Sequence, residues 1–264
     1  TPTGSDNVNS DNIPDDDHGH GTHVAGIIAA DNDNQANSPI ITNGMQGVAY
    51  GAKLYIFKAG DSNGNFPDAA IASSLSEAIT AGVDIINNSY GDSAEIGVDC
   101  NSASSCETAI GSSVYTQMEA VGAADIINVW AAGNDSKDNP SVLAGAHLYD
   151  TDFKDLSIAV VAVGTDGKIA SYSNKCGVVA AYCVAAPGSA IYSANYFANG
   201  YHVAKNGTSM AAPMVSGALA LVKHEFSSLT NVQVVSRLLT TALDTDEYSQ
   251  SAIYGHGLIN LNGA

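Results

Sequence analysis

Two short segments far apart in the sequence carry residue types that could cleave an acyl bond. They are residues 20–26 (HGTHVAG) and 206–213 (NGTSMAAP). Each is typical of the start of a helix, where free N–H groups and the helix dipole stabilise an oxyanion. Because a serine needs an adjacent base to act as a nucleophile at neutral pH, Ser209 and His20 are a candidate nucleophile and base. Taken singly, each residue has a plain structural alternative, a helix cap for Ser209 and a glycine-rich turn for His20.

Two other segments end apolar runs in a way that suits the same chemistry. Residues 129–134 (VWAAGN) end at Asn134, whose side-chain amide could donate to a developing oxyanion. Such a donor is typically worth about 100- to 1000-fold in rate. Residues 86–91 (INNSYG) end a second apolar run, and an edge of this kind can pair with an extended peptide. Either segment could also be an ordinary strand-to-loop transition.

A metal site is a competing interpretation of the N-terminal region. Carboxylates and imidazoles are crowded there, and a metal hydrolase could be built from Asp15, Asp16, Asp17, His18, His20 and His23. No Cys-x-x-Cys pair is present to indicate a zinc site.

Composition limits the classes of partner. The chain has 264 residues, 45% of them hydrophobic, so it can bury a substantial core. Nine Lys and Arg residues against 27 Asp and Glu residues give a formal charge of −18. This balance argues against binding to nucleic acid or to an anionic membrane surface. No run is long and apolar enough to span a bilayer.

The cysteine spacing invites two local disulfides, Cys100 with Cys106 and Cys176 with Cys183. Two such bridges would place the protein in an oxidising compartment, outside the cell or at its surface. Four free thiols in a cytosolic enzyme are the alternative.

Apolar periodicity predicts alternating strands and helices. Strands are expected at 53–58, 83–87, 125–131 and 157–163, and helices at 24–30, 69–81, 111–124, 209–226 and 232–242. Loops are expected at 1–17 and 31–43, and a serine-rich insertion at 100–106. Pro213 is expected in the first turn or so of its helix, where proline is tolerated. This order favours a single α/β domain over residues 1–264, with a parallel central sheet.

The motifs together resemble those of the subtilases, the subtilisin-like serine proteases. Residues 20–26 match the histidine motif of that family, 207–213 the serine motif, and 131–134 (AAGN) the segment with the oxyanion asparagine. The resemblance continues to 254–260 (YGHGLIN) and implies a three-layer fold with helices on both faces of a mainly parallel sheet. A narrower resemblance, through 47–50, 86–91, 170–177 and Cys183, is to the protease passenger domains of Gram-negative autotransporters.

The resemblance implies a secreted or cell-surface endopeptidase that acts on proteins or peptides. Ser209 would attack the scissile carbonyl, His20 would move the proton, and Asn134 with the Ser209 N–H would hold the oxyanion. The substrate would lie between two edges, formed by Ser89, Tyr90 and Gly91 on one side and by Ala131, Ala132 and Gly133 on the other. Tyr90 stands where subtilisins commonly have a smaller aliphatic residue, which implies reshaped subsites.

The resemblance implies no cofactor for the chemistry. Structural calcium is expected in the oxygen-rich loops 6–17 and 31–37, although their spacing matches no fixed calcium loop.

The third member of the triad is missing from this pattern. In the family it is an aspartate at the end of a central strand, roughly thirty residues before the histidine, in the order Asp, His, Ser. No apolar run precedes His20, so we assign the role to none of the upstream acids, Asp6, Asp11, Asp15, Asp16 or Asp17. The alternatives are a nicked enzyme with a docked N-terminal peptide, a fragment without the strand, and a sequence that begins after it.

We favour the nicked enzyme, because omitting a central strand would leave buried N–H and C=O groups unpaired. We expect the peptide between the strands at 53–58 and 125–131. If the aspartate is absent, a catalytically impaired binding or passenger module is the alternative function.

Overall fold

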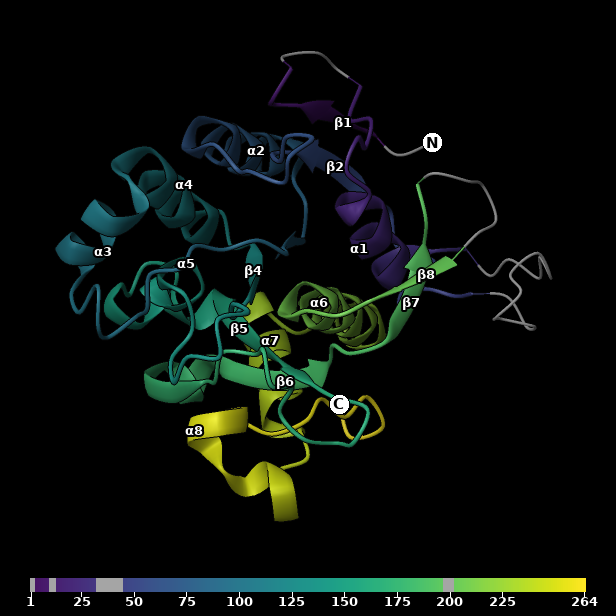
Figure 1. Ribbon diagram of the computed structural model, residues 1–264, viewed down its shortest axis with the longest axis vertical. Coiled ribbons are helices and arrows are strands. Elements are labelled where there is room, and N and C mark those ends of the chain that lie inside the picture. Colours follow the sequence, from purple (N-terminus) through teal and green to yellow (C-terminus); the bar gives the residue numbers. More distant parts are fainter. Residues whose placement is uncertain (1–2, 10–12, 32–44, 197–201) are drawn as a thin grey trace.

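A computed structural model describes residues 3–9, 13–31, 45–196 and 202–264. Its centre is a four-stranded parallel sheet with the order β3-β4-β5-β6 (Figure 1). These strands span Ile85–Asn88, Ile127–Ala131, Ser157–Val163 and Cys183–Pro187. Val129 pairs with Ile158 and Val160 with Val184 in the register of the sheet. The α/β fold expected from the sequence is confirmed.

Two smaller sheets flank this centre. Strands β1 (Thr3–Asp6) and β2 (Tyr55–Lys58) form a parallel pair, and β7 (Ile191–Ala194) and β8 (His202–Lys205) form an antiparallel pair. The strand β1 is a correction, because 1–17 was expected to be loop. Its four residues have no apolar run, and the pairing with β2 supplies the ordering that the local sequence does not predict.

Eight α-helices are present in the described part of the chain. They are α1 (His20–Ala29), α2 (Asp68–Ala81), α3 (Ala103–Ile110), α4 (Ser112–Ala123), α5 (Val142–Gly145), α6 (Thr208–Glu225), α7 (Asn231–Thr240) and α8 (Ser251–Tyr254). The helix α3 was not expected within the serine-rich insertion, and Ser102 with Ser105 forms a capping box that starts it. Among these residues no helix has the length and apolar character needed to cross a bilayer.

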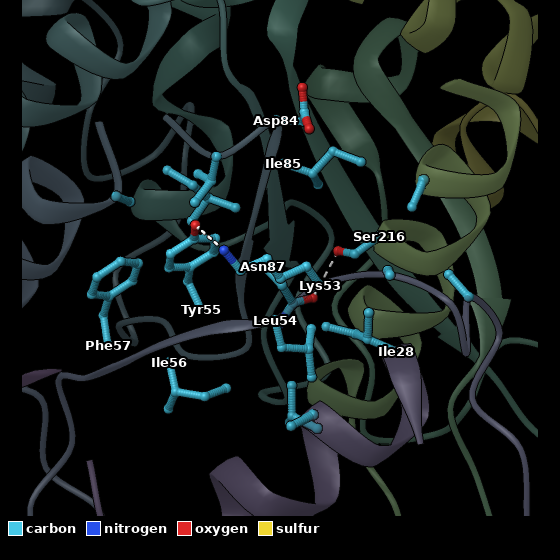
Figure 2. Close-up of a pocket in the computed structure, with 18 of the residues that line it drawn as sticks. Ile28, Lys53, Leu54, Tyr55, Ile56, Phe57, Asp84, Ile85, Asn87 and Ser216 are labelled. Atoms are coloured by element: carbon cyan, nitrogen blue, oxygen red, sulfur yellow. Dashed lines mark hydrogen bonds between the residues drawn. The ribbon is translucent and has the colours of Figure 1, made fainter. Parts of the chain in front are cut away.

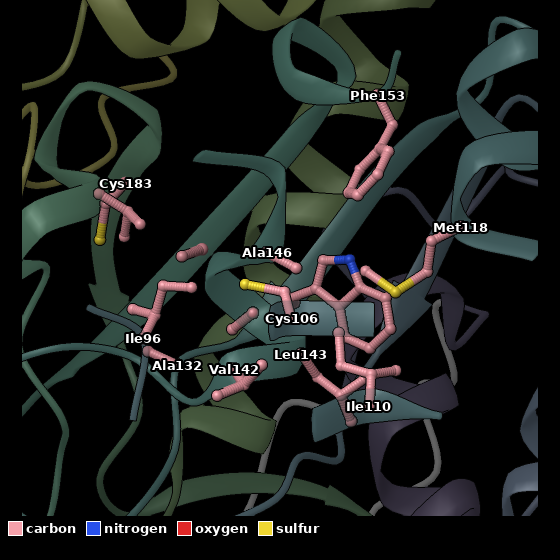
Figure 3. Packing of buried hydrophobic residues seen from close by; sticks show 14 of the residues in the cluster. Ile96, Cys106, Ile110, Met118, Ala132, Val142, Leu143, Ala146, Phe153 and Cys183 are labelled. Atoms are coloured by element: carbon pink, nitrogen blue, oxygen red, sulfur yellow. The ribbon is translucent and has the colours of Figure 1, made fainter. Parts of the chain in front are cut away.

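The central strands are buried on both faces, which is why their sequences are continuously apolar. One face meets α2, α3, α4 and α5 through a cluster around Trp130, Met118 and Phe153 (Figure 3). The other face meets α6 and α7, with Ile158 and Val160 of β5 pointing toward it. Alternate residues of β5 therefore belong to different cores, and the sheet is sandwiched between two helical layers.

The sheet is interrupted between β2 and β3. In the described residues β2 pairs with β1 alone and β3 with β4 alone, so one edge of each strand has no strand partner. A cavity of about 900 Å³ lies there, lined by both strands and by α1, α2 and α6 (Figure 2). We had expected the missing strand between the strands at 53–58 and 125–131, that is, between β2 and β4. Since β3 already occupies the place beside β4, the interruption lies between β2 and β3.

Candidate active site

His20 is the first residue of α1, and the turn before it is held by one carboxylate. Gly19 has a φ of 87°, a left-handed conformation that favours glycine. Asp16 accepts hydrogen bonds from the backbone N–H groups of Gly19 at 2.6 Å and Thr22 at 2.7 Å, and from the Thr22 hydroxyl at 2.6 Å. Burial opposes ionisation of Asp16, but these bonds outweigh it and lower the pKa of the carboxyl group.

Ser209 is the second residue of α6, and its surroundings explain an unusual proline. Pro213 lies in the second turn of α6 rather than in the first, which corrects the expectation from the sequence. A proline has no N–H to give to the carbonyl four residues earlier, here that of Ser209. The Ser89 hydroxyl donates to this carbonyl at 2.9 Å instead, and the Ser209 hydroxyl donates to the Ser89 carbonyl at 3.1 Å.

The turn before Ser209 is held from both sides. Gly207 has a φ of 152°, which L side chains rarely adopt, and its N–H donates to the Tyr172 hydroxyl at 3.1 Å. The Asn134 carbonyl oxygen accepts from the Thr208 N–H at 2.9 Å and from the Thr208 hydroxyl at 3.1 Å. The Asn134 amide nitrogen has no hydrogen-bond partner in the described residues, so it is free to donate to a ligand beside Ser209.

Apolar packing brings the two helix starts together. Met210 of α6 packs with Val24 and Ile27 of α1, and all three side chains are buried. His20 and Ser209 therefore lie in the first turns of two neighbouring helices, on one side of the molecule. The Ser209 hydroxyl is hydrogen-bonded to Ser89 in this state, and no hydrogen bond links it to the His20 ring.

Burial and a nearby cation make His20 a weak base in this state. Burial is the larger cause and repulsion from Lys205 the second, and together they lower the pKa of His20 to about 4. Lys205 donates to the carbonyl of Gly19 at 3.2 Å, which places its ammonium group beside the turn. No carboxylate in the described part of the chain hydrogen-bonds the His20 ring.

His23 has a structural role that the motif alone did not reveal. Its side chain is fully buried, and Nε2 lies 2.9 Å from the Val203 carbonyl and 3.1 Å from the Ile191 carbonyl. Two carbonyl acceptors at one nitrogen assign the proton to Nε2. The His23 ring therefore links α1 to the β7–β8 pair through these two carbonyls.

We predict that His23→Leu destabilises the fold by about 1–3 kcal/mol, because the Val203 and Ile191 carbonyls lose the donor that the buried His23 ring supplies. Thermal unfolding followed by circular dichroism would measure the change. His18→Leu, on an exposed neighbour, is the matched control and should leave the melting temperature unchanged. Equal melting temperatures for the His23 variant and the control would contradict this role.

The expected substrate edges lie beside these groups. Ser89 contacts Ser209 directly, and Gly133 donates its N–H to the Thr208 hydroxyl at 3.3 Å. Tyr90 stacks on Phe66 with ring centroids 4.7 Å apart and meets Trp130 edge-on at 5.7 Å. Burial raises the pKa of Tyr90, whose hydroxyl donates to Asn88. The Tyr90 ring therefore packs against the core and holds the edge at 89–91 in place.

The remaining edge residues follow the same two strands. Gly91 lies near Ser141, where a Cβ would approach the Ser141 hydroxyl to 3.1 Å, and Ala131 ends β4. The Ala132 carbonyl accepts from the Ser141 N–H at 2.8 Å and from the Asn174 side chain at 3.1 Å.

The acidic N-terminal cluster does not form a metal site in the described residues. No three side chains among His, Cys, Asp and Glu gather there in a way that could hold an ion. Asp6 and Asp16 direct their oxygens at N–H, O–H and ammonium donors instead. Most of the loop at 31–37 lies outside the described residues.

Asp6 is buried at the end of β1, contrary to our expectation that it lacks a strand. Its carboxylate pairs with Lys58 at 3.1 Å and caps the turn at Val8 and Asn9. Burial opposes ionisation, but these bonds lower the pKa of Asp6 to about 2. Its strand, β1, is separated from the cavity by β2. Asp6 makes no hydrogen bond to His20.

Both expected disulfides are present, Cys100 with Cys106 and Cys176 with Cys183, and no cysteine is free. No motif in the sequence assigned Tyr172 or Lys205 a role in the site. Their roles depend on contacts across the fold that no local motif encodes.

The chain is similar to known proteins over nearly its whole length. The model of the subtilase family matches residues 3–257. Subtilisin DY of Bacillus licheniformis is 36% identical over 263 residues, covering 99% of this chain and 82% of that protein. Serotype-specific antigen 1 of Mannheimia haemolytica is 42% identical over 141 residues, covering 52% of this chain and 15% of that protein.

Solved structures agree with these matches. The structure of sphericase has a TM-score of 0.75 and 26% identity, and the alignment covers 98% of this chain and 84% of that one. The prenylagaramide maturation protease PagA has a TM-score of 0.74 at 22% identity, which shows the shared fold alone. With its family model, its relatives and its fold in agreement, this chain belongs to the subtilase family of serine endopeptidases.

Proposed function

We propose that Ser209, His20 and Asn134 carry out the peptide hydrolysis of this subtilase. The observation that carries the proposal is their arrangement: two packed helix starts bear the nucleophile and base, and Asn134 is fixed against the serine turn. The Ser209 hydroxyl first leaves the Ser89 carbonyl and turns to His20.

The reaction then follows from these positions. Ser209 Oγ forms a bond to the scissile carbonyl carbon while His20 takes its proton. The Asn134 amide and the Ser209 N–H stabilise the resulting oxyanion. The C–N bond breaks as His20 returns the proton to the leaving amine, and water then releases the acyl group by the same steps.

We propose that the substrate pairs with the two edges at 89–91 and 131–133. Their main-chain groups would hold an extended peptide across Ser209. Since Tyr90 packs inward on Phe66, its contribution is to fix the edge rather than to fill a subsite with a flexible side chain.

We further propose that a docked N-terminal peptide supplies the triad carboxylate, and that 1–264 is the remainder of one catalytic domain. Support comes from His20, which has no carboxylate partner in the described residues, and from Asp6 and Asp16, whose oxygens are committed elsewhere. Without such a carboxylate, kcat should be lower by about 10⁴.

Lys205→Gln should raise the pKa of His20, because it removes the positive charge that disfavours the imidazolium. The neutral base would then be lost at a higher pH, so the acidic limb of kcat/KM should move upward. A titration of the His20 ring protons by NMR measures the same change without activity. Lys168→Gln, at an exposed lysine, is the control, and a limb that moves downward would contradict the assignment.

We propose an extracellular or cell-surface location. Two disulfides favour an oxidising compartment, and the likeness to a protein named as a serotype-specific antigen supports exposure at the surface. The resemblance to autotransporter passenger domains fits the same location.

We propose structural calcium only for the acidic loops 6–17 and 31–37, and no metal for the chemistry. The support is the density of oxygen donors. If calcium is bound, a chelator should lower the melting temperature and added calcium should restore it. An unchanged melting temperature would exclude this site.

A serine-directed phosphonyl reagent tests the assignment of the nucleophile. Covalent label should appear on Ser209 by peptide mass mapping, and Ser209→Ala should abolish it. A folded protein that binds peptides but resists the reagent at every concentration would favour the impaired binding module.

A further inference from the structure

One residue closes the space between the two proposed substrate edges. Ser141 is the residue before α5, and its N–H donates to the Ala132 carbonyl at 2.8 Å. On the opposite side, a Cβ built on Gly91 would lie 3.1 Å from the Ser141 hydroxyl oxygen and 4.0 Å from the Ala131 carbonyl oxygen. Ser141 therefore lies between one edge and the other.

We propose that Ser141 sets the size of the substrate side chain next to the scissile bond, and that the enzyme cleaves after glycine, alanine or serine. The inference rests on the proposed function, because it concerns the substrate residue whose carbonyl Ser209 attacks. It narrows the substrate class to peptide bonds that follow a small side chain.

The floor of this space is shut off from solvent. Ala132 and Ser141 have 0% of their surface exposed, and Ala131 has 3%. A pocket deep enough for a long or aromatic side chain would leave its floor open to water. The Cβ position at Gly91 is already within contact distance of both walls. The space between the edges is therefore shallow, with room for little more than a methyl group.

The floor is also tied to both edges. The residue after the serine, Val142, donates its N–H to the Ala94 carbonyl at 3.0 Å, and the Leu143 N–H donates to the Asp92 carboxylate at 3.1 Å. Both acceptors follow the edge at 89–91 in the chain, whereas the serine itself is bonded to the other edge. A displacement of this segment would break hydrogen bonds on both sides, so a large side chain cannot push the floor away without a cost.

The path of the substrate brings one side chain onto this floor. Side chains of an extended peptide point alternately to opposite faces, so every second residue between the edges faces inward. The edge at 89–91 begins beside the nucleophile, since the hydroxyl groups of Ser89 and Ser209 each donate to the carbonyl of the other residue. Gly91, two residues along this edge, faces Ser141. The inward side chain nearest the nucleophile is therefore the one that meets the floor.

A peptide library that varies only the residue before the scissile bond measures the preference. We expect kcat/KM to fall at least about 100-fold from alanine to leucine or phenylalanine, since a single methylene is worth about 10- to 200-fold in a discriminating pocket. A preference for lysine or arginine would show instead that a cationic side chain reaches Asp92, whose second carboxylate oxygen is buried without a hydrogen-bond partner in the described residues. That result, or equal rates after alanine and phenylalanine, would overturn the proposal.

Ser141→Gly should open the floor, because it removes both side-chain heavy atoms. Leucine and phenylalanine substrates should then gain at least about tenfold relative to alanine. Ser141 caps α5 by accepting the Ala144 N–H at 3.4 Å, and glycine at such a position costs little stability. Ser102→Gly, at the exposed serine that caps α3, is the matched control and should leave the preference unchanged. An unchanged preference in a folded Ser141→Gly protein would contradict the proposal.

Gly91→Ala tests the same contact from the other side. The added methyl group should close the remaining space, so cleavage after alanine should slow at least about tenfold relative to cleavage after glycine. Combining this change with Ser141→Gly should restore cleavage after alanine, because the two substitutions exchange a Cβ across one gap. A double variant without this recovery would show that Gly91 acts on the substrate main chain and that Ser141 does not set the size.

A labelling experiment separates this inference from the proposed function. A small alkylphosphonyl fluoride should label Ser209 whatever the depth of the floor. A peptide phosphonate with an alanine side chain should label it at least about 100-fold faster than one with a phenylalanine side chain. If no reagent labels Ser209, the proposed function fails and the size preference with it. Label from the small reagent, with equal rates for the two phosphonates, would overturn the size preference alone.

Discussion

Ser209→Ala should lower kcat for peptide hydrolysis by about 10⁶-fold, the loss that removal of the nucleophile causes in subtilisin. The reason is that the variant cannot form the acyl-enzyme, so only the oxyanion donors and substrate binding remain to accelerate attack by water. The measurement is single-turnover cleavage of a quenched fluorescent peptide by the wild type and by the folded variant under the same conditions.

The fold should tolerate this change. The Ser209 hydroxyl makes one hydrogen bond, to the Ser89 carbonyl, and the Ser209 carbonyl keeps its bond from the Ser89 hydroxyl. Ser236→Ala, an exposed serine of α7, is the control for handling and should keep full activity. More than about a thousandth of the original kcat in a folded Ser209→Ala protein would show that another group performs the attack.

The central strands were predicted well because a strand that is buried on both faces must be continuously apolar, and such runs can be recognised in the sequence. The run at 157–163 is apolar at nearly every position, and the structure places all seven residues in β5. The starts of α1 and α6 were predictable from a different signal, the glycine-bearing turns that precede them. The pairing of the cysteines was predicted from their spacing, with separations of 6 and 7 residues in the two disulfides.

The features that the sequence did not predict share a different physical cause. β1 has no apolar pattern and exists because it pairs with β2, an interaction between distant segments. The position of Pro213 depended on Ser89, which supplies the hydrogen bond that the proline leaves unmade. Lys205 lies 185 residues after His20, and its effect on the pKa of the histidine arises from the packing of β8 against α1. Local sequence carries none of these contacts.

The interruption of the sheet was predictable only in part. The sequence showed no apolar strand ending in an acid before His20, but it did not show where the central sheet is interrupted, because the order of strands in a parallel sheet is set by crossovers. The structure puts the interruption between β2 and β3, at a cavity that α1 and α6 also line.

Asn134→Asp should lower kcat by at least about 100- to 1000-fold with little change in KM. The wild-type side chain has two tasks on two atoms. Its oxygen accepts from the Thr208 N–H and hydroxyl, and its nitrogen is free to donate to the oxyanion. An aspartate keeps the acceptor and replaces the donor by a second oxygen, which repels the developing charge. Because the oxyanion forms only in the transition state, the loss should fall on kcat.

Asn134→Leu separates these two tasks. It removes donor and acceptor together, and Thr208 is fully buried, so its N–H would be left without a partner. We expect a similar loss of kcat and, in addition, a free energy of unfolding lower by about 1–3 kcal/mol. The Asp variant should unfold like the wild type at neutral pH. If both variants lost stability equally and the Asp variant kept its kcat, Asn134 would be a brace for the serine turn, and the oxyanion donor would have to be sought among the backbone N–H groups around Ser209.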